Sequence, residues 1–390
     1  MESIRRFFVP PAGSFFLLGP RGTGKTTWLR AALPDALFIN LLQPERYREF
    51  AARPERLREL VLGSPEKRDV VVDEVQRVPE ILNVVHDLIE SDVIRRFVLT
   101  GSSARKLRRG GIDLLGGRAL VRDLHPFMGA ELTDFDLDRA LRYGMVPLVL
   151  ASADPADTLS AYASLYLEQE VRVEGLVRDV GQFARFLEAI SFSQGSGLNV
   201  SNVARDAQAQ RRTVVGYVDV LEDLLLAFRV PVFRRRAKRQ LAAHPKFFYF
   251  DCGVFRALRP MGPLDRPEEI DGAALEGLVA QHLRAWAAYR DRDMAMYFWR
   301  TRSGVEVDLV LYGRDGLWGF EVKNSDRVRP EDLRGLKAFG VEYPESSRVL
   351  LYRGSERLVV SDIWCIPVDE FLARLHPHDD LGQVTGFRDQ

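Results

Sequence analysis

The sequence predicts an α/β protein of two or three domains: a helix-covered parallel sheet, a helical and winged-helix middle region, and a second α/β domain. Three observations support this. Apolar, strand-like runs alternate with helical segments in the first part of the chain. Helical patterns then dominate, and strands return after Gly272. We place the domains at residues 1–152, 153–258 and 259–390, because the small, proline-bearing segment Ala151–Ala156 is typical of a boundary.

Composition narrows the class of protein. The 390 residues are 46% hydrophobic and 28% charged, as in ordinary globular proteins. No apolar run approaches the ~20 residues needed to span a bilayer, and the N-terminus lacks a signal-peptide core, so we expect a cytoplasmic location without membrane association. Two cysteines, Cys252 and Cys365, exclude a disulfide framework and a cysteine zinc site. The net charge is zero, so nucleic acid would have to be bound by local basic patches.

The first predicted strand, Ser14–Leu18, leads into Gly-Pro-Arg-Gly-Thr-Gly-Lys-Thr, and the first turns of a helix follow. This fits the phosphate-loop pattern G-x-x-x-x-G-K-[ST], whose backbone N–H groups and helix N-terminus face a phosphate. Lys25 would neutralise the β- and γ-phosphates, and Thr26 would ligate Mg²⁺. The predicted ATP-binding residues are Gly19, Pro20, Arg21, Gly22, Thr23, Gly24, Lys25, Thr26 and Thr27.

The predicted strand Val70–Val72 ends in two adjacent carboxylates, Asp73 and Glu74. In phosphate-loop enzymes an Asp at this place holds Mg²⁺ through water. Glu74 follows the metal ligand without being one, which suits a general base acting on the attacking water. The two motifs together predict ATP hydrolysis.

Ala36–Leu41 and Arg96–Thr100 are the remaining strands expected in this sheet. The polar end of the latter resembles the first sensor of AAA-type ATPases, which reads the γ-phosphate. Ser102 is the first choice and Thr100 its neighbour, and a simple helix N-cap is the competing interpretation.

Basic residues follow, and one of them is a candidate arginine finger supplied by a neighbouring subunit. Arg118, just before the apolar run Ala119–Val121, is the first candidate, and Arg108 or Arg109 the second. Each is equally compatible with an ordinary surface arginine.

The middle region predicts two short helices across a tight turn, Leu198–Asp206 and Thr213–Leu225, with Ser201 as the N-cap of the first. The strands Ala227–Phe233 and Lys246–Phe250 then flank a basic turn, which is the layout of a winged helix. The turn is either a clamp for nucleic-acid phosphates, a solvated turn that protects a strand edge, or part of a subunit contact. Its basic residues are Arg234, Arg235, Arg236, Lys238 and Arg239.

The last region predicts a helix over residues 273–283 that carries Glu276, then a hairpin and a third strand. Glu321 and Lys323 share one face of that third strand, and Asp308 on the hairpin can oppose Glu321. Two such carboxylates are typical Mg²⁺ ligands, and Lys323 would act on water or on charge at phosphorus. Glu276 would add a further contact.

This order of elements and residues resembles the PD-(D/E)xK nuclease core, in which helix Glu331–Phe339 and strand Arg348–Tyr352 would come next. The resemblance implies metal-dependent DNA cleavage. The competing interpretation is an inherited scaffold used for binding or assembly, with the charges kept as a satisfied polar cluster.

Over nearly its whole length the chain resembles prokaryotic AAA-type ATPases with an uncharacterised C-terminal region. The residues that carry this resemblance are Gly19–Thr26, Asp73–Gln76, Leu99–Ser103, Gly117-Arg118, His125, Glu131, and the final Leu-Glu-Gly, Val-Asp and Glu-Val-Lys motifs. Ala274–Gly277 departs from the expected pattern, since a small polar residue is expected after Glu276.

The expected function is that of an ATP- and Mg²⁺-dependent enzyme that remodels, moves along or processes DNA as a homo-oligomer, such as a hexameric ring. One alternative is a STAND-type nucleotide switch with slow turnover. Another is a C-terminal half that serves only in oligomerisation.

Overall fold

A computed structural model describes residues 4–91, 95–102, 115–166, 177, 179–234, 244–290 and 293–386. The chain divides into two compact units. The first unit comprises Met1–His125 with Asp223–Leu225, and the second comprises Pro126–Glu222 with Leu226–Gln390.

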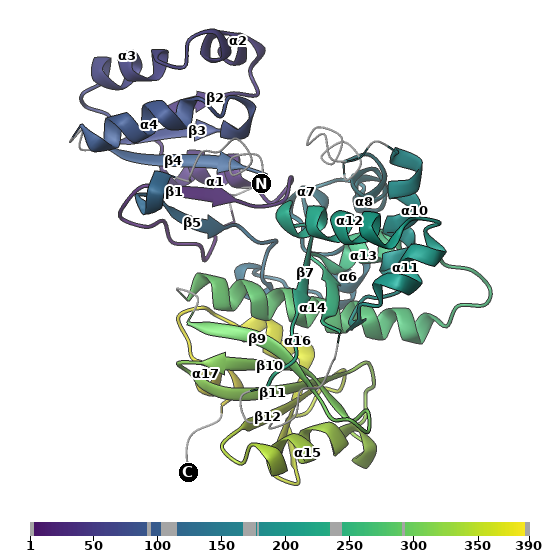
Figure 1. Cartoon of the computed structure of the whole chain (residues 1–390). Helices are drawn as coiled ribbons and strands as arrows, with labels where there is room; N and C mark the ends of the chain where they lie inside the picture. The colour runs from purple at the N-terminus through teal and green to yellow at the C-terminus, as the bar shows by residue number, and fades with distance from the viewer. Residues whose placement is uncertain are drawn as a thin grey trace. The chain divides into compact units, whose positions relative to one another are not determined.

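As predicted, the first unit is built on a parallel sheet; the sheet has five strands, in the order β2-β3-β4-β1-β5 (Figure 1). Its strands are β1 (Phe15–Leu18), β2 (Leu37–Asn40), β3 (Asp69–Asp73), β4 (Arg96–Gly101) and β5 (Leu120–Asp123). Its helices and 3₁₀ turns are α1 (Lys25–Ala32), α2 (Pro44–Ala52), α3 (Arg56–Gly63), η1 (Val75–Arg77), α4 (Ile81–Glu90) and η2 (Leu115–Gly117).

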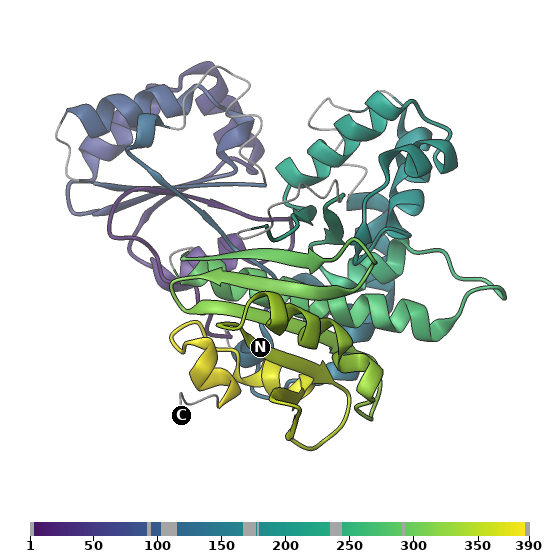
Figure 2. The same cartoon turned by 60° about the horizontal axis from the view of Figure 1, so that its bottom comes forward.

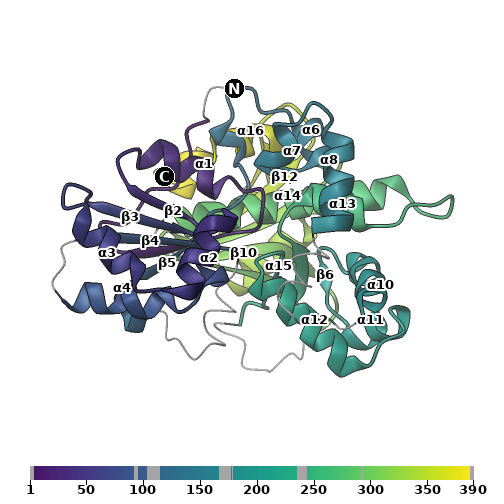
Figure 3. The ribbon, with the colours of Figure 1, turned by 90° about the horizontal axis from the view of Figure 1, so that it is seen from above.

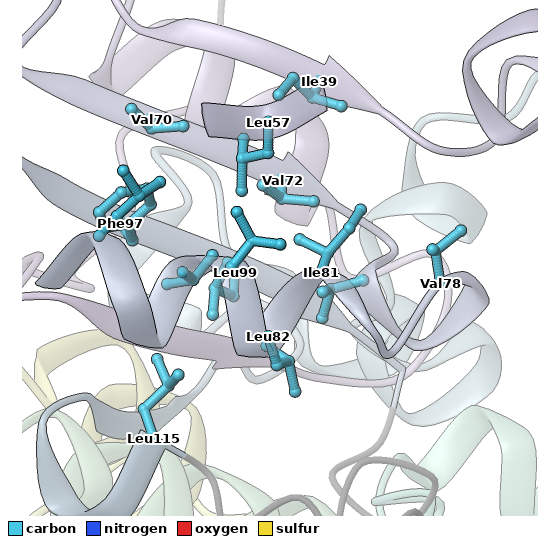
Figure 4. Packing of buried hydrophobic residues seen from close by; sticks show 14 of the residues in the cluster. Ile39, Leu57, Val70, Val72, Val78, Ile81, Leu82, Phe97, Leu99 and Leu115 are labelled. Carbon is cyan, nitrogen blue, oxygen red and sulfur yellow. The ribbon is translucent and has the colours of Figure 1, made fainter. Parts of the chain in front are cut away.

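Alternate side chains of these strands enter two different cores. On one face, Val70, Val72 and Leu99 pack against Leu57 of α3 and Leu82 of α4 (Figure 4). On the other face, Phe15 contacts Phe8, which in turn packs edge-on against Trp28 of α1. Helices therefore cover both faces, as a parallel sheet requires.

The strand order brings three carboxyl ends together. Because β4 lies between β3 and β1, the residues that follow these strands meet at one edge of the sheet. Ligands of open α/β sheets bind outside the carboxyl ends of the strands. This edge carries the phosphate loop, Asp73 and Thr100.

The second unit begins with helices and a three-stranded sheet in the order β6-β8-β7. Figures 1 and 3 both show α10, α11 and α12 as neighbours. The elements are η3 (Gly129–Glu131), α6 (Leu137–Tyr143), α7 (Pro147–Leu150), α8 (Pro155–Ala161), the π-helical turn η4 (Tyr162–Tyr166), α10 (Val180–Ser191), β6 (Ser196–Gly197), α11 (Val200–Asp206), α12 (Arg211–Asp223), β7 (Ala227–Val230), β8 (Lys246–Tyr249) and α13 (Cys252–Leu258).

The cap of α11 differs from the prediction. Asn199 is the N-cap, and its Oδ1 accepts hydrogen bonds from the backbone N–H groups of Ser201 and Asn202. Ser201 lies inside the first turn. Asn and Ser are nearly equivalent caps, so the sequence did not distinguish them.

A six-stranded mixed sheet in the order β13-β14-β12-β11-β10-β9 completes this unit. Strands β9, β10 and β11 are antiparallel, whereas β11, β12 and β14 run parallel. Helix α15 lies across the strands as the yellow-green helix in front of the sheet in Figure 2. The elements are α14 (Pro267–Tyr289), β9 (Met294–Arg300), β10 (Glu306–Gly313), β11 (Gly316–Lys323), η5 (Pro330–Leu333), α15 (Arg334–Glu342), β12 (Ser347–Tyr352), β13 (Leu358–Val360), β14 (Ile363–Pro367), α16 (Val368–Arg374) and α17 (Leu381–Thr385).

This order of helix, hairpin, strand, helix and strand is the one that the sequence predicted for the C-terminal region. None of the helices in the described ranges is long and apolar enough to cross a membrane.

Candidate functional site

The phosphate loop connects buried strand β1 to helix α1 by a turn that only glycine accommodates well. Gly22 and Gly24 have φ angles of 83° and 87°, in the left-handed region. A Cβ on Gly19 would lie 2.6 Å from the carbonyl oxygen of Leu124. The three glycines are thus explained by backbone geometry, and α1 begins at Lys25.

Lys25 lies folded over this loop. Its Nζ donates hydrogen bonds to the carbonyl oxygens of Gly19 (2.6 Å) and Pro20 (3.2 Å). The residue is only 7% exposed. The ammonium is therefore held directly at the loop that would surround a phosphate.

A chain of hydrogen bonds links the loop to the ends of β3 and β4. Thr26 Oγ1 donates to Asp73 Oδ2 over 2.8 Å, and Thr100 Oγ1 donates to Asp73 Oδ1 over 2.5 Å. The backbone N–H of Glu74 donates to Thr100 Oγ1 over 3.0 Å. Thr100, the neighbour of the predicted sensor Ser102, therefore positions both acidic residues.

Glu74 is held in an uncommon conformation, with φ 63° and ψ 46°. Its Oε2 accepts a hydrogen bond from Gln76 Nε2 at 2.7 Å, and the same Nε2 lies 3.4 Å from Ser102 Oγ. Ser102 thus reaches Glu74 through Gln76. Gln76 had no predicted role, although it lies two residues after Glu74 in the same motif.

Other predicted residues of this unit lie further out. Arg21 and Thr27 are exposed. Arg118 forms an ion pair with Glu90 of α4, in which both side chains are about half exposed (40% and 51%). Such an exposed pair is weak, so it leaves Arg118 available for another anion. The second finger candidates, Arg108 and Arg109, lie outside the described residues.

The residues at this edge fit a magnesium ion. Mg²⁺ takes hard oxygen ligands and is usually held by one or two protein groups plus substrate phosphates. The Thr26 hydroxyl and the Asp73 carboxylate present such oxygens next to the loop. These two side chains are the ones that would hold the ion.

The C-terminal candidates are arranged differently. Strand β10 shifts register against β9 between Val307 and Val310, and Asp308 lies in this irregularity. Its Oδ2 accepts a hydrogen bond from the Val322 N–H of β11 at 2.9 Å, and its Oδ1 lies 3.3 Å from Lys246 Nζ. Irregularities of this kind often re-aim a side chain. Here both oxygens of Asp308 already have partners.

Lys246, at the start of β8, is the centre of this cluster. Its Nζ lies 2.9 Å from Glu276 Oε1, 3.4 Å from Glu306 Oε1 and 3.4 Å from the Asp308 carbonyl oxygen. The side chain is 2% exposed. Burial alone would lower the pKa of Lys246, but the three carboxylates outweigh it and raise the pKa well above its usual value.

Glu321 and Lys323 pair with each other, as their shared face predicted, with 2.6 Å between Lys323 Nζ and Glu321 Oε1. Burial, helped by the charge of Asp308, raises the pKa of Glu321 to about 8. Burial lowers the pKa of Lys323, yet Glu321 outweighs it, so the pKa is raised overall. A lysine held in its charged form by a carboxylate is a poor base.

This cluster does not fit a catalytic magnesium ion. Across the part of the chain that the structure describes, no three His, Cys, Asp or Glu side chains are placed to hold a metal. The space between Glu276 and Asp308 is taken by an ammonium of the same chain. Glu276 therefore meets Lys246, not a metal or its water.

Two members of the cluster were missed by the sequence analysis. Glu306 lies two residues before Asp308, and side chains two apart in a strand share a face, so this spacing could have predicted that Glu306 joins Asp308 in the cluster. Lys246 opens an otherwise aromatic strand, and a charged residue in a buried strand signals a partner. Of the predicted basic turn, Arg234 is described and exposed, whereas Arg235, Arg236, Lys238 and Arg239 lie outside the described residues.

Three family models match successive parts of the chain. Residues 12–133 match a family model described as an AAA domain. Residues 134–265 and 271–371 each match a model described as a domain of unknown function (DUF8612 and DUF4143). The first match contains the phosphate loop, Asp73 and Thr100, and it confirms the AAA-type part of the predicted resemblance.

Among curated proteins, the chain is similar to uncharacterized proteins. One from Mycobacterium tuberculosis and one from Mycobacterium bovis are each 27% identical over 368 residues, which are 91% of this chain and 80% of the relative. One from Haemophilus influenzae is 24% identical over 215 residues, 50% of this chain and 53% of the relative.

A solved structure of the replication initiator DnaA bound to AMPPCP and single-stranded DNA is 12% identical, with a TM-score of 0.25. It covers 54% of this chain and 82% of that one. At that score the likeness supports no conclusion about this chain.

Proposed function

We propose that this protein is an ATPase that binds ATP with Mg²⁺ at the carboxyl edge of the first sheet and hydrolyses it there. The observation that carries the proposal is the hydrogen-bond chain from Thr26 through Asp73 and Thr100 to Glu74. It joins the phosphate loop, the metal-binding positions and the candidate base in one network. A glycine-rich turn without a nucleotide role would not need it.

Each residue of the network has a defined task. The loop N–H groups and the α1 N-terminus receive the phosphates. Lys25 turns from the carbonyl oxygens of its own loop to the β- and γ-phosphates, where it offsets charge. Glu74 accepts the proton of the attacking water, and Thr100 fixes the backbone from which Glu74 projects.

Thr26 and Asp73 would hold magnesium, which would supply neutralisation of the negative charge on the phosphates. Arg118 is the proposed finger that a second copy of the chain would contribute, which implies a homo-oligomer such as a ring. The exposed ion pair with Glu90 is weak enough for Arg118 to exchange it for the phosphates of a nucleotide bound by a neighbouring subunit.

We propose DNA as the partner on which ATP hydrolysis acts. The order α10-β6-α11-α12-β7-β8, with β8 between β6 and β7, supports a winged helix. In that fold the second helix of the helix-turn-helix enters the major groove by its N-terminal residues. Arg211 and Arg212 at the start of α12 are exposed, and within the described ranges neither forms an ion pair. Metal-dependent DNA cleavage is not proposed, because Lys246 fills the C-terminal cluster.

The test is steady-state ATP hydrolysis with and without DNA, together with nucleotide binding, for wild type, Lys25→Ala and Glu74→Gln. We expect Lys25→Ala to lose binding or turnover, and Glu74→Gln to bind normally but turn over at least ~100-fold more slowly. Glu66→Gln, an exposed carboxylate of the same unit, is the matched control and should behave as wild type. Wild-type turnover in Glu74→Gln would refute the assignment of the base.

The response to DNA separates the candidate functions. Strong stimulation supports an enzyme acting on DNA. Slow turnover that DNA leaves unchanged would instead support a nucleotide-controlled switch. The absence of any DNA binding at low salt would restrict the second unit to assembly.

A further inference from the structure

We propose that the Lys246 ammonium is the permanent cation of the acid cluster formed by Glu276, Glu306 and Asp308. The acid cluster of this chain is then a structural joint with its own built-in cation, and it binds no catalytic metal.

The geometry around Lys246 supports this assignment. Its Nζ has oxygens of three carboxylates and one backbone carbonyl at 2.9–3.4 Å, contributed by helix α14 and strand β10. Carboxylate and carbonyl oxygens are the ligands that hard divalent cations select. The oxygens around Lys246 are thus of the type that such cations select, but their centre is a nitrogen that brings positive charge and no ligand.

A second observation comes from Glu321. Its side chain is 9% exposed, its Oε1 pairs with Lys323, and within the described part of the chain its Oε2 has no hydrogen-bond partner. The two ammonium groups therefore divide the acids between them: Lys246 pairs with Glu276, Glu306 and Asp308, whereas Glu321 pairs with Lys323 through Oε1.

Space explains why the ammonium and a metal exclude each other. Lys246 Nζ lies 2.9–3.4 Å from oxygens of Glu276, Glu306 and Asp308, so it occupies the position from which a cation could contact all three carboxylates. Removing Lys246 instead would leave buried carboxylates uncompensated, which is strongly destabilising.

The consequence concerns how the second unit is held together. Lys246 belongs to the three-stranded sheet of the middle region, whereas Glu276 and Asp308 belong to the C-terminal α/β region. The ion-pair cluster therefore ties strand β8 to helix α14 and strand β10. The motif that predicts metal chemistry here instead attaches strand β8 to helix α14 and strand β10.

The experiment removes the ammonium and offers a metal in its place. All proteins carry Asp73→Asn and contain no nucleotide, so that the ATPase site does not bind the probe. Lys246→Met is compared with Lys337→Met, an exposed lysine of α15 in the same unit. Thermal unfolding is followed by tryptophan fluorescence against Mn²⁺ concentration, and bound Mn²⁺ is counted by electron paramagnetic resonance.

We expect Lys246→Met to melt at a lower temperature than its parent, and Mn²⁺ to raise that temperature with increasing concentration while an additional ion is bound. The parent and Lys337→Met should show neither effect. A folded Lys246→Met protein that gains no Mn²⁺ would overturn the proposal.

A second measurement does not depend on the folding of Lys246→Met. Mn²⁺ binding to the Asp73→Asn parent is compared with binding to the same protein carrying Asp308→Asn. The proposal requires that the two bind equally. A site in the parent that Asp308→Asn removes would show that the cluster holds metal beside Lys246, and would overturn it.

Discussion

Acid is expected to destabilise the second unit through one histidine, His282 of α14. Its Nδ1 lies 2.7 Å from the Leu278 carbonyl oxygen, and its Nε2 lies 2.9 Å from the Gly129 backbone nitrogen. A carbonyl only accepts and an N–H only donates, so Nδ1 carries the proton and Nε2 is the acceptor. Protonation of Nε2 would break the bond to Gly129 inside a fully buried site.

The size of the effect follows from the pKa. Burial lowers the pKa of His282 from 6.5 to about 4, although the bond to Leu278 opposes the change. Because the folded pKa lies below the unfolded one, stability is fully present above pH 6.5 and is lost as the pH falls toward 4. Linkage gives a loss of about 2 kcal/mol at pH 5 and about 3 kcal/mol below pH 4.

The assay is urea unfolding at pH 8 and pH 5, followed by tryptophan fluorescence. Trp286 lies one helical turn after His282 and is fully buried, so its emission reports this unit. His282→Gln keeps an acceptor near Gly129 but cannot titrate, and His86→Gln, on exposed α4 surface, is the control. The variant should start less stable at pH 8 and lose about 2 kcal/mol less than wild type on going to pH 5.

The same comparison of wild type with His282→Gln can refute the prediction. Equal losses of stability in wild type and His282→Gln between pH 8 and pH 5 would mean that His282 does not titrate in this range. Acid sensitivity would then come from other groups.

Two further predictions concern catalysis and DNA. Thr100→Val should lower kcat for ATP hydrolysis more than Ser102→Ala does. The reason is that Thr100 contacts Asp73 and the Glu74 backbone directly, whereas Ser102 reaches Glu74 only through Gln76. Equal effects of the two substitutions in ATPase assays would contradict this order. Replacing both Arg211 and Arg212 by Ala should weaken DNA binding, which fluorescence anisotropy measures. The slope of log affinity against log salt should fall by about one unit per lost phosphate contact. An unchanged slope would show that α12 does not contact DNA.

The nucleotide site could be predicted from the sequence because its determinants are local. The phosphate loop is continuous, and its glycines, lysine and threonine are required by backbone conformation and charge within a few residues. Asp73 and Glu74 directly follow an apolar run, and the carboxyl ends of parallel strands meet at one edge. The order of the predicted helices and strands along the chain in both α/β regions followed from the same periodic patterns.

What could not be predicted depends on which side chains meet across the fold. Whether Thr100 or Ser102 reaches Asp73 is decided by the register of β4 beside β3, which puts the Thr100 hydroxyl within 2.5 Å of the carboxylate. Asn199 replaced Ser201 as a cap because the two residues differ little in local preference.

The clearest case is the C-terminal cluster. Period-two alternation in the sequence was enough to place Glu321 beside Lys323 and to mark Asp308 as a candidate ligand. Only the tertiary structure brought Lys246 between Glu276 and Asp308, over a separation of 62 residues from Asp308. Local patterns determine which groups a strand presents, but the charge at the centre of a buried cluster depends on every element that packs around it. For this chain, that charge is an ammonium that pairs with Asp308, one of the two carboxylates that the motif predicted as metal ligands.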